Sequence, residues 1–130
     1  MTRQHARTGT VVIVDDDEAV RNALKMLAQS QGWEVHTFAS AADFLESREP
    51  SNGQPTCLVV DLQMPSMDGA ELVETLQSRG NKTPVIVLTA GPSGALARRA
   101  RAAGVKKVVS KPFDPAQWLE AVRDVLHPVH

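Results

Sequence analysis

Residues 57–69 read CLVVDLQMPSMDG, the segment of the chain with the clearest structural pattern. Four apolar residues run into a single acid, Asp61, and a loop with Pro65 follows before Asp68 and Gly69. An apolar run bounded by turn residues is typical of a strand buried on both faces of a parallel sheet. A lone buried carboxylate is unfavourable, and open α/β sheets keep their chemistry at the carboxyl edge. Asp61 is therefore a candidate functional residue at that edge. The alternative is an acid that only caps a loop, because Asp is common where strands turn.

The composition describes one globular domain. The chain has 130 residues, of which 42% are hydrophobic and 22% charged, and this length is enough for a single core. A formal net charge of −1 gives no general attraction to nucleic acid. We expect residues 1–9 to form a disordered lead, residues 10–127 the domain and residues 128–130 a short tail.

Cysteine usage and hydropathy indicate a cytoplasmic protein. Cys57 is the single cysteine, which excludes an intramolecular disulfide and suits a reducing compartment. It opens an apolar run, so we interpret it as a small buried hydrophobe. No apolar stretch reaches the length of a membrane span, and the first ten residues lack the core of a signal peptide. The sequence therefore predicts no membrane contact.

Strand-like runs alternate with helical patterns along the chain. Strands are predicted at residues 10–14, 33–38, 57–60, 84–88 and 105–109. Helical patterns follow each run, and the fourth helix, about residues 95–103, has only Leu96 as a large apolar residue. This alternation predicts an α/β fold of the (βα)5 type, a doubly wound five-stranded parallel sheet with helices on both faces and strand order 2-1-3-4-5.

Capping residues mark the starts of several helices. The candidate pairs are Ser40 with Asp43, Asp68 with Glu71, and Asp114 with Pro115. The first two pairs resemble capping boxes, and Asp followed by Pro is a strong helix start. Gly80 is predicted to end the third helix, and residues 50–55 are predicted to form a loop. Trp118 falls on the apolar stripe of the last helix, so we predict that it belongs to the core.

Polar residues follow four of the predicted strands, where they would converge on one edge of the sheet. They are Asp15, Asp16 and Asp17 after the first strand, Asp61 at the end of the third, Thr89 after the fourth and Lys111 after the fifth.

This set of side chains predicts a magnesium site. Clustered carboxylates repel one another unless a cation neutralises them, and oxygen ligands suit Mg²⁺. Zinc is not indicated, because no histidine falls near this edge. The four histidines are His5, His36, His127 and His130. An alternative is an acidic first helical turn favoured by the helix dipole. That alternative explains Asp17 and Glu18 better than Asp15 and Asp16, which would face Asp61.

The same residues predict phosphoryl transfer. Asp61 would be the nucleophile and would form an acyl phosphate. The metal would neutralise developing charge on the phosphoryl group, while Lys111 and Thr89 would contact its oxygens.

Four stretches together resemble the receiver domain of bacterial two-component response regulators. They are VVIVDDDEAVR, CLVVDLQMPSMDG, PVIVLTA and VVSKPF, and the resemblance runs from about residue 10 to residue 126. It is strongest to receivers of transcription-factor type. Any one of these motifs alone would be weak, whereas their joint occurrence in this order is specific.

The resemblance implies roles for the matching residues. Asp61 is implied to accept phosphate from the phosphohistidine of a sensor histidine kinase or a phosphotransfer protein. Asp16 is implied to bind Mg²⁺ directly, Asp15 largely through water, and Gln63 through its backbone carbonyl. Thr89 and Lys111 are implied to be the switch hydroxyl and the lysine that pairs with phosphate. The family also implies a cis bond between Lys111 and Pro112.

One position departs from the family pattern. Family members usually carry Tyr or Phe three residues before the lysine, and here that residue is Val108. Switching through Thr89 would then lack its aromatic partner. The fourth helix and its entry, residues 91–94, could carry the signal instead.

A group of cations lies around the fourth helix and fifth strand. Its members are Arg98, Arg99, Arg101, Lys106 and Lys107. In the family this face mediates output contacts or a homodimer, whereas the alternative is a solvated helix face. No aromatic residues are interspersed among these cations, so the sequence predicts no direct contact of this domain with nucleic acid.

Two other functions share this fold class. A flavodoxin-like cofactor binder has the same strand order, but it needs a phosphate loop where this chain has four consecutive acids. A protein-binding module that no longer uses phosphorylation is the second alternative, and only Val108 favours it. The chain could be a stand-alone receiver, a phosphorelay shuttle or a domain of a longer regulator. It is not expected to be an enzyme with an independent substrate.

Overall fold

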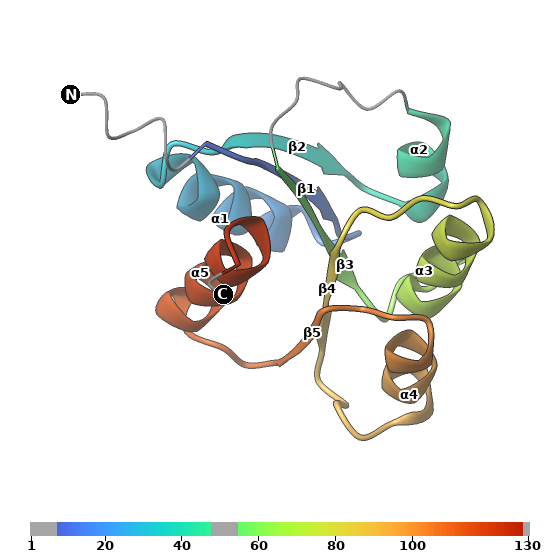
Figure 1. Cartoon of the computed structure of the whole chain (residues 1–130). Coiled ribbons are helices and arrows are strands. Elements are labelled where there is room, and N and C mark those ends of the chain that lie inside the picture. The colour runs from blue at the N-terminus through green and yellow to red at the C-terminus, as the bar shows by residue number, and fades with distance from the viewer. Residues whose placement is uncertain (1–7, 48–54, 129–130) are drawn as a thin grey trace.

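A computed structural model of the chain describes residues 8–47 and 55–128. Each strand is followed by a helix along the chain (Figure 1). The strands are β1 (Thr10–Val14), β2 (Glu34–Phe38), β3 (Thr56–Asp61), β4 (Val85–Thr89) and β5 (Lys107–Ser110). The helices are α1 (Glu18–Ser30), α2 (Ala41–Glu46), α3 (Gly69–Ser78), α4 (Ala95–Ala102) and α5 (Pro115–Leu126).

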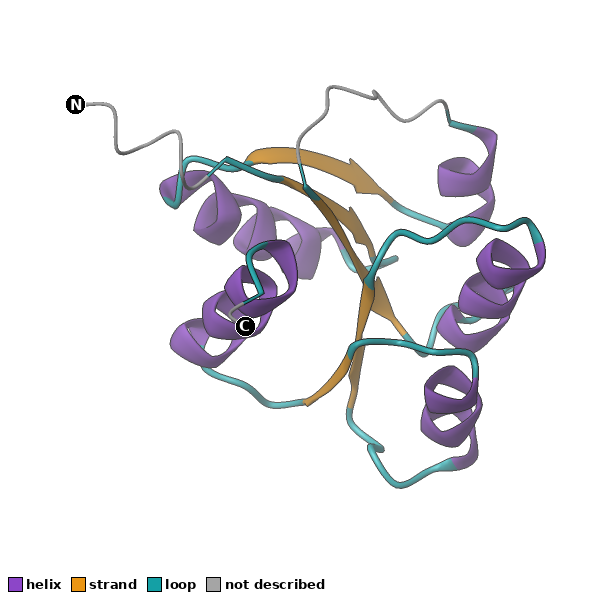
Figure 2. Cartoon of the chain, viewed as in Figure 1, coloured by secondary structure: helices purple, strands orange, loops and turns teal. Residues whose placement is uncertain are grey.

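The strands form one parallel sheet in the order β2-β1-β3-β4-β5, which confirms the predicted topology. Helices α1 and α5 cover one face of the sheet, and α2, α3 and α4 cover the other (Figure 2). None of the helices in the described part of the chain is long and apolar enough to cross a bilayer.

Most predicted elements are found, with shifts at their ends. The largest shift is in β5, which begins at Lys107 and not at Val105. The Lys106 amide donates to the Val85 carbonyl at 2.7 Å, and pairing in register starts only with Lys107 opposite Ile86. The predicted loop at residues 50–55 lies outside the described residues except for Pro55. Residues 1–7 and 129–130 lie outside them as well, so the predicted lead and tail remain predictions.

Side-chain caps begin four of the helices. Asp68 and Glu71 form a complete capping box, as predicted, and Asp114 forms one with Gln117. The Ser40 pair is only half a box, because Ser40 Oγ accepts from the Asp43 amide at 3.0 Å without the reciprocal bond. Asp17 caps α1.

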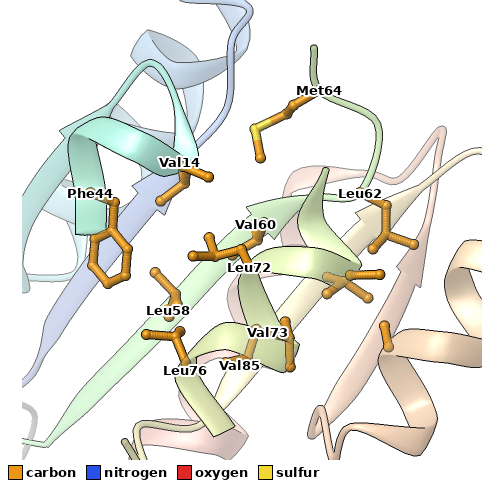
Figure 3. Close-up of a cluster of buried hydrophobic side chains, with 14 of the residues drawn as sticks. Val14, Phe44, Leu58, Val60, Leu62, Met64, Leu72, Val73, Leu76 and Val85 are labelled. Carbon is orange, nitrogen blue, oxygen red and sulfur yellow. The ribbon is translucent and has the colours of Figure 1, made fainter. Parts of the chain in front are cut away.

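The core lies in two layers, one on each face of the sheet. One layer holds the inward side chains of α2 and α3 against β1, β3 and β4 (Figure 3). The other layer packs α1 and α5 against the opposite face and contains both tryptophans, Trp33 and Trp118. Trp118 is fully buried, which confirms its assignment to the core. Cys57 is also fully buried, and burial raises the pKa of its thiol to about 12, as expected for a residue that only packs.

Gly69 lets α3 begin directly against the end of β3. A Cβ at this position would lie 2.7 Å from the Asp61 carbonyl oxygen and 2.8 Å from Leu62 Cα, both in the backbone. We expect Gly69→Ala to lower the free energy of unfolding by about 2 kcal/mol, because the chain must shift to relieve the clash.

Urea unfolding of the two proteins measures this difference. Gly91→Ala is the matched control, because its Cβ would meet only Thr89 Oγ1, at 3.9 Å. Equal stability of Gly69→Ala and the wild type would contradict the close approach of α3 to β3.

Candidate functional site

The ends of four parallel strands bring the predicted residues to one edge of the sheet. Asp15 directly follows β1, Asp61 ends β3, Thr89 ends β4 and Lys111 directly follows β5. The register aligns these ends, since Val14 pairs with Val60, Asp61 with Leu88 and Thr89 with Ser110. One carboxylate oxygen from each of Asp15, Asp16 and Asp61 lies within 4.8 Å of the other two.

Asp61 is a largely buried carboxylate with a lysine beside it. Its side chain is 9% exposed. Lys111 Nζ lies 3.3 Å from Asp61 Oδ1, which also accepts from the Gln63 amide at 3.3 Å. The ammonium group partly offsets the carboxylate charge, and the second oxygen, Oδ2, has no hydrogen bond within the described residues.

Asp15 is the most deeply buried acid of the site, with 1% of its surface exposed. Burial raises the pKa of its carboxyl from 3.8 to about 6, and the charges of Asp61 and Asp16 add to this rise. The amide of Asp17 and the charge of Lys111 act in the opposite direction. Asp15 Oδ1 accepts from the Asp17 amide at 2.9 Å. The other oxygen, Oδ2, is buried without a hydrogen-bond partner in the described part of the chain.

The carboxylate oxygens of Asp15, Asp16 and Asp61 are suitable ligands for a hard divalent cation. The ligand atoms on offer are carboxylate oxygens, which Mg²⁺ prefers, and a cation would satisfy the buried Oδ2 of Asp15. His36 lies on β2 beside Glu34, and His127 follows the end of α5. Neither belongs to the acidic cluster, while His5 and His130 lie outside the described residues. The donor set therefore fits magnesium better than zinc.

Thr89 is held from two sides. Its hydroxyl oxygen accepts from the Gly91 amide at 2.9 Å, and its carbonyl accepts from the Lys111 amide at 2.8 Å. The bond between Lys111 and Pro112 is cis, as the family resemblance implies. Val108 lies in β5 beside Val87 and packs, partly buried, against the core layer under α3 and α4.

Four of the five cations of the predicted basic face bind other groups of the protein. Arg99 pairs with Glu74 on α3, and Lys107 Nζ lies 3.3 Å from Asp124 Oδ2 on α5. Arg98 and Arg101 turn back onto backbone carbonyls of the loop before α4. Lys106 is exposed and makes no ion pair within the described residues.

Sequence reasoning missed Arg21 and the packing role of Gly69. Arg21 Nη1 donates to the Asp15 carbonyl at 2.8 Å, which fixes the turn between β1 and α1. Its signal is a basic residue four positions after the cap of a helix, too common to identify on its own. Gly69 stands next to the backbone of Asp61, and no pattern in the sequence distinguishes it from a glycine that only turns the chain.

Known proteins are similar to this chain in sequence. The family model of the response regulator receiver domain matches residues 11–123. The chain is 40% identical over 113 residues to the transcriptional regulatory protein FixJ of Azorhizobium caulinodans, covering 87% of this chain and 53% of FixJ. It is 33% identical over 120 residues to the response regulator protein TodT of Pseudomonas putida, covering 92% of this chain and 52% of TodT. The chain thus spans about half the length of these relatives.

Solved structures agree in fold. The response regulator StyR superposes with a TM-score of 0.81 at 41% identity, covering 91% of this chain and 59% of that one. The crystal structure of FixJ-N gives a TM-score of 0.77 at 35% identity, covering 93% of this chain and 96% of that one. With its sheet order, its acidic edge and these matches, the chain belongs to the family of response regulator receiver domains.

Proposed function

We propose that this domain accepts a phosphoryl group on Asp61 from the phosphohistidine of a sensor histidine kinase or a phosphotransfer protein. The observation that carries the proposal is the cluster of Asp15, Asp16 and Asp61 with Lys111 Nζ at 3.3 Å from Asp61. Three acids and one ammonium group on one sheet edge are the groups that phosphoryl transfer to a carboxylate needs.

In the proposed reaction, Asp61 Oδ2 attacks phosphorus, because Oδ1 is already engaged by Lys111 and the Gln63 amide. An O–P bond forms to Asp61 while the P–N bond to the donor histidine breaks, and the imidazole leaves with the electron pair. The Lys111 ammonium then pairs with a phosphoryl oxygen, and the Thr89 hydroxyl donates to another.

Magnesium would be held by Asp15, Asp16, Asp61 and the backbone carbonyl of Gln63. When bound, it supplies positive charge that offsets the negative charge on the phosphoryl oxygens. Asp15 would contribute a buried oxygen that has no hydrogen-bond partner among the described residues, and the exposed side chain of Asp16 would contribute a second oxygen.

The acyl phosphate would act through Thr89 on the face formed by α4, β5 and α5. The output residues would be Arg98, Arg99, Arg101, Lys106 and Lys107, and this face would also form a homodimer. Val108 has no ring to rotate, so the loop before α4 would carry the change. Direct contact of this domain with nucleic acid or a membrane is not part of the proposal, and the cytoplasm is its proposed compartment. Relatives of this chain are named transcriptional regulators, which supports control of transcription as the final output.

The proposal is tested by incubating the protein with acetyl phosphate, with and without Mg²⁺, and measuring the intact mass. We expect a gain of one phosphoryl group that requires Mg²⁺ and does not occur when the ion is chelated before acetyl phosphate is added. The ion is needed because the three acids of the site repel the negatively charged phosphoryl group. Borohydride reduction of the acyl phosphate should convert Asp61 to homoserine, which peptide mapping locates. A folded protein that gains no phosphoryl group under any condition would favour the protein-binding module that does not use phosphorylation.

A further inference from the structure

The loop between β4 and α4 contacts the proposed switch hydroxyl directly. Thr89 Oγ1 accepts from the Gly91 amide at 2.9 Å. A hydroxyl oxygen can accept such a bond and still donate its own proton. The Gly91 amide therefore fixes the direction of the Thr89 side chain and leaves its proton for a phosphoryl oxygen.

Helix α4 begins without a side-chain cap, unlike the other four helices in the described part of the chain. Its N-cap residue is Gly94, at the end of a loop that reads GPSG. Two arginines of α4 reach back and bind this loop instead. Arg98 Nη1 donates to the Ser93 carbonyl at 2.7 Å, and Arg101 Nη1 donates to the Pro92 carbonyl at 2.7 Å.

Helix α4 is itself anchored to α3. Arg99 Nε donates to Glu74 Oε2 at 3.1 Å and Arg99 Nη2 to Oε1 at 2.5 Å, a paired geometry with high directional specificity. The Arg99 hydrogen bonds hold the pKa of the Glu74 carboxyl below its usual value. Ala97 and Ala100 are the fully buried side chains of α4, and Leu96 packs, partly buried, against the same core layer. The loop therefore lies between Thr89 and helix α4, which packs on the core layer and is joined to α3 by the Arg99–Glu74 ion pair.

We propose that Arg98 and Arg101 are positioning residues for Thr89. By binding the carbonyls of Ser93 and Pro92, they fix the loop and the Gly91 amide, and this amide orients the Thr89 hydroxyl for donation to the phosphoryl group on Asp61. The two arginines act through the loop and do not touch the phosphoryl group. This inference rests on the function proposed above.

A thermodynamic cycle tests the inference. The affinity for beryllofluoride, an analogue of the phosphoryl group, is measured by calorimetry in the presence of Mg²⁺. Four proteins are compared: the wild type, the double variant Arg98→Ala/Arg101→Ala, Thr89→Val, and the triple variant that combines all three substitutions. With Thr89 present we expect the double variant to bind about three- to tenfold more weakly, the effect of one net hydrogen bond. With Thr89→Val we expect no further weakening. An equal loss in both backgrounds, no loss, or a gain in affinity would overturn the inference.

Two controls separate local from general effects. Arg79→Ala removes another exposed arginine whose side chain makes no hydrogen bond within the described residues, and it should leave the affinity unchanged. Arg79→Ala removes one positive charge and the double variant removes two, so a loss of binding free energy about half that of the double variant would mean that net charge is responsible, which contradicts the inference. A wild type that binds no beryllofluoride and gains no phosphoryl group would instead refute the proposed function.

Amide hydrogen exchange gives a readout without any phosphoryl analogue. The Gly91 amide should exchange faster in Arg98→Ala/Arg101→Ala than in the wild type, because its bond to Thr89 is less constrained. Both arginines are exposed, so the variant should keep its fold. Unchanged exchange at Gly91 would show that the arginines do not hold the loop.

Discussion

Asp61→Asn is expected to abolish the gain of a phosphoryl group while leaving the protein folded. The amide has nearly the same shape as the carboxylate, and its oxygen can still accept from the Gln63 amide and from Lys111. It lacks the nucleophilic oxygen that forms the acyl phosphate. Its neutral side chain also removes one of the charges that raise the pKa of Asp15, so the stability above pH 6 should be retained or increased.

The measurement is intact mass after incubation with acetyl phosphate and Mg²⁺, together with urea unfolding of the same samples. Asp68→Asn is the matched control, since it makes the same chemical change in the following loop. Asparagine is as good an N-cap as aspartate, and Asp68 only caps α3. The control should gain one phosphoryl group like the wild type. A gain by Asp61→Asn equal to that of the control would place the acceptor at another residue.

Asp15→Asn is expected to stabilise the metal-free protein. The folded-state pKa of Asp15, about 6, lies above its ordinary value of 3.8, so ionising this carboxyl opposes folding. The penalty is absent below about pH 4, develops between pH 4 and 6, and is complete above pH 6. A shift from 3.8 to about 6 corresponds to roughly 3 kcal/mol at most. An amide avoids this penalty and keeps the oxygen that accepts from Asp17.

Unfolding at pH 5 and pH 8 without Mg²⁺ measures this effect. The advantage of Asp15→Asn over the wild type should be larger at pH 8 than at pH 5, by about 1.4 kcal/mol. Asp114→Asn, which makes the same chemical change at an exposed helix cap, is the matched control. Added Mg²⁺ should stabilise the wild type far more than it stabilises Asp15→Asn. The affinity of the wild type for Mg²⁺ should fall below about pH 6, because protons then compete with the ion for Asp15. If Asp15→Asn is no more stable than the wild type at pH 8, the prediction is contradicted. The ionised Asp15 carboxylate would then already be stabilised by a partner in the folded protein.

Local patterns were enough to predict the sheet and the positions of most residues of the candidate site. The run at residues 10–14 matches β1 residue for residue, because a buried strand with turn residues after it leaves little choice. Asp61, Thr89 and Lys111 were placed correctly at the strand ends, since parallel topology brings those ends to one edge. Strand β5 was predicted two residues early, because the letters VKKVV suit several registers and only pairing with β4 selects one.

Features that depend on contacts across the chain could not be predicted. The depth of Asp15, the bond between Arg99 and Glu74, and the return of Arg98 and Arg101 onto their own loop all depend on how elements pack. The sequence shows five cations around the fourth helix and fifth strand, but it does not show that Arg99 and Lys107 have acidic partners on α3 and α5. Sequence spacing shows charges and their order, but it does not show which of them meet.

The placement of both indole rings in one core layer determines what optical spectroscopy can observe in this protein. Trp33 and Trp118 lie buried between the sheet and α1 and α5, and the chain contains no tyrosine. Intrinsic fluorescence therefore monitors that face of the sheet alone. Far-ultraviolet circular dichroism, by contrast, reports on the total helix content of the protein. A movement of α4 would leave the emission spectrum almost unchanged, so detecting it by fluorescence needs a dye attached to the opposite face.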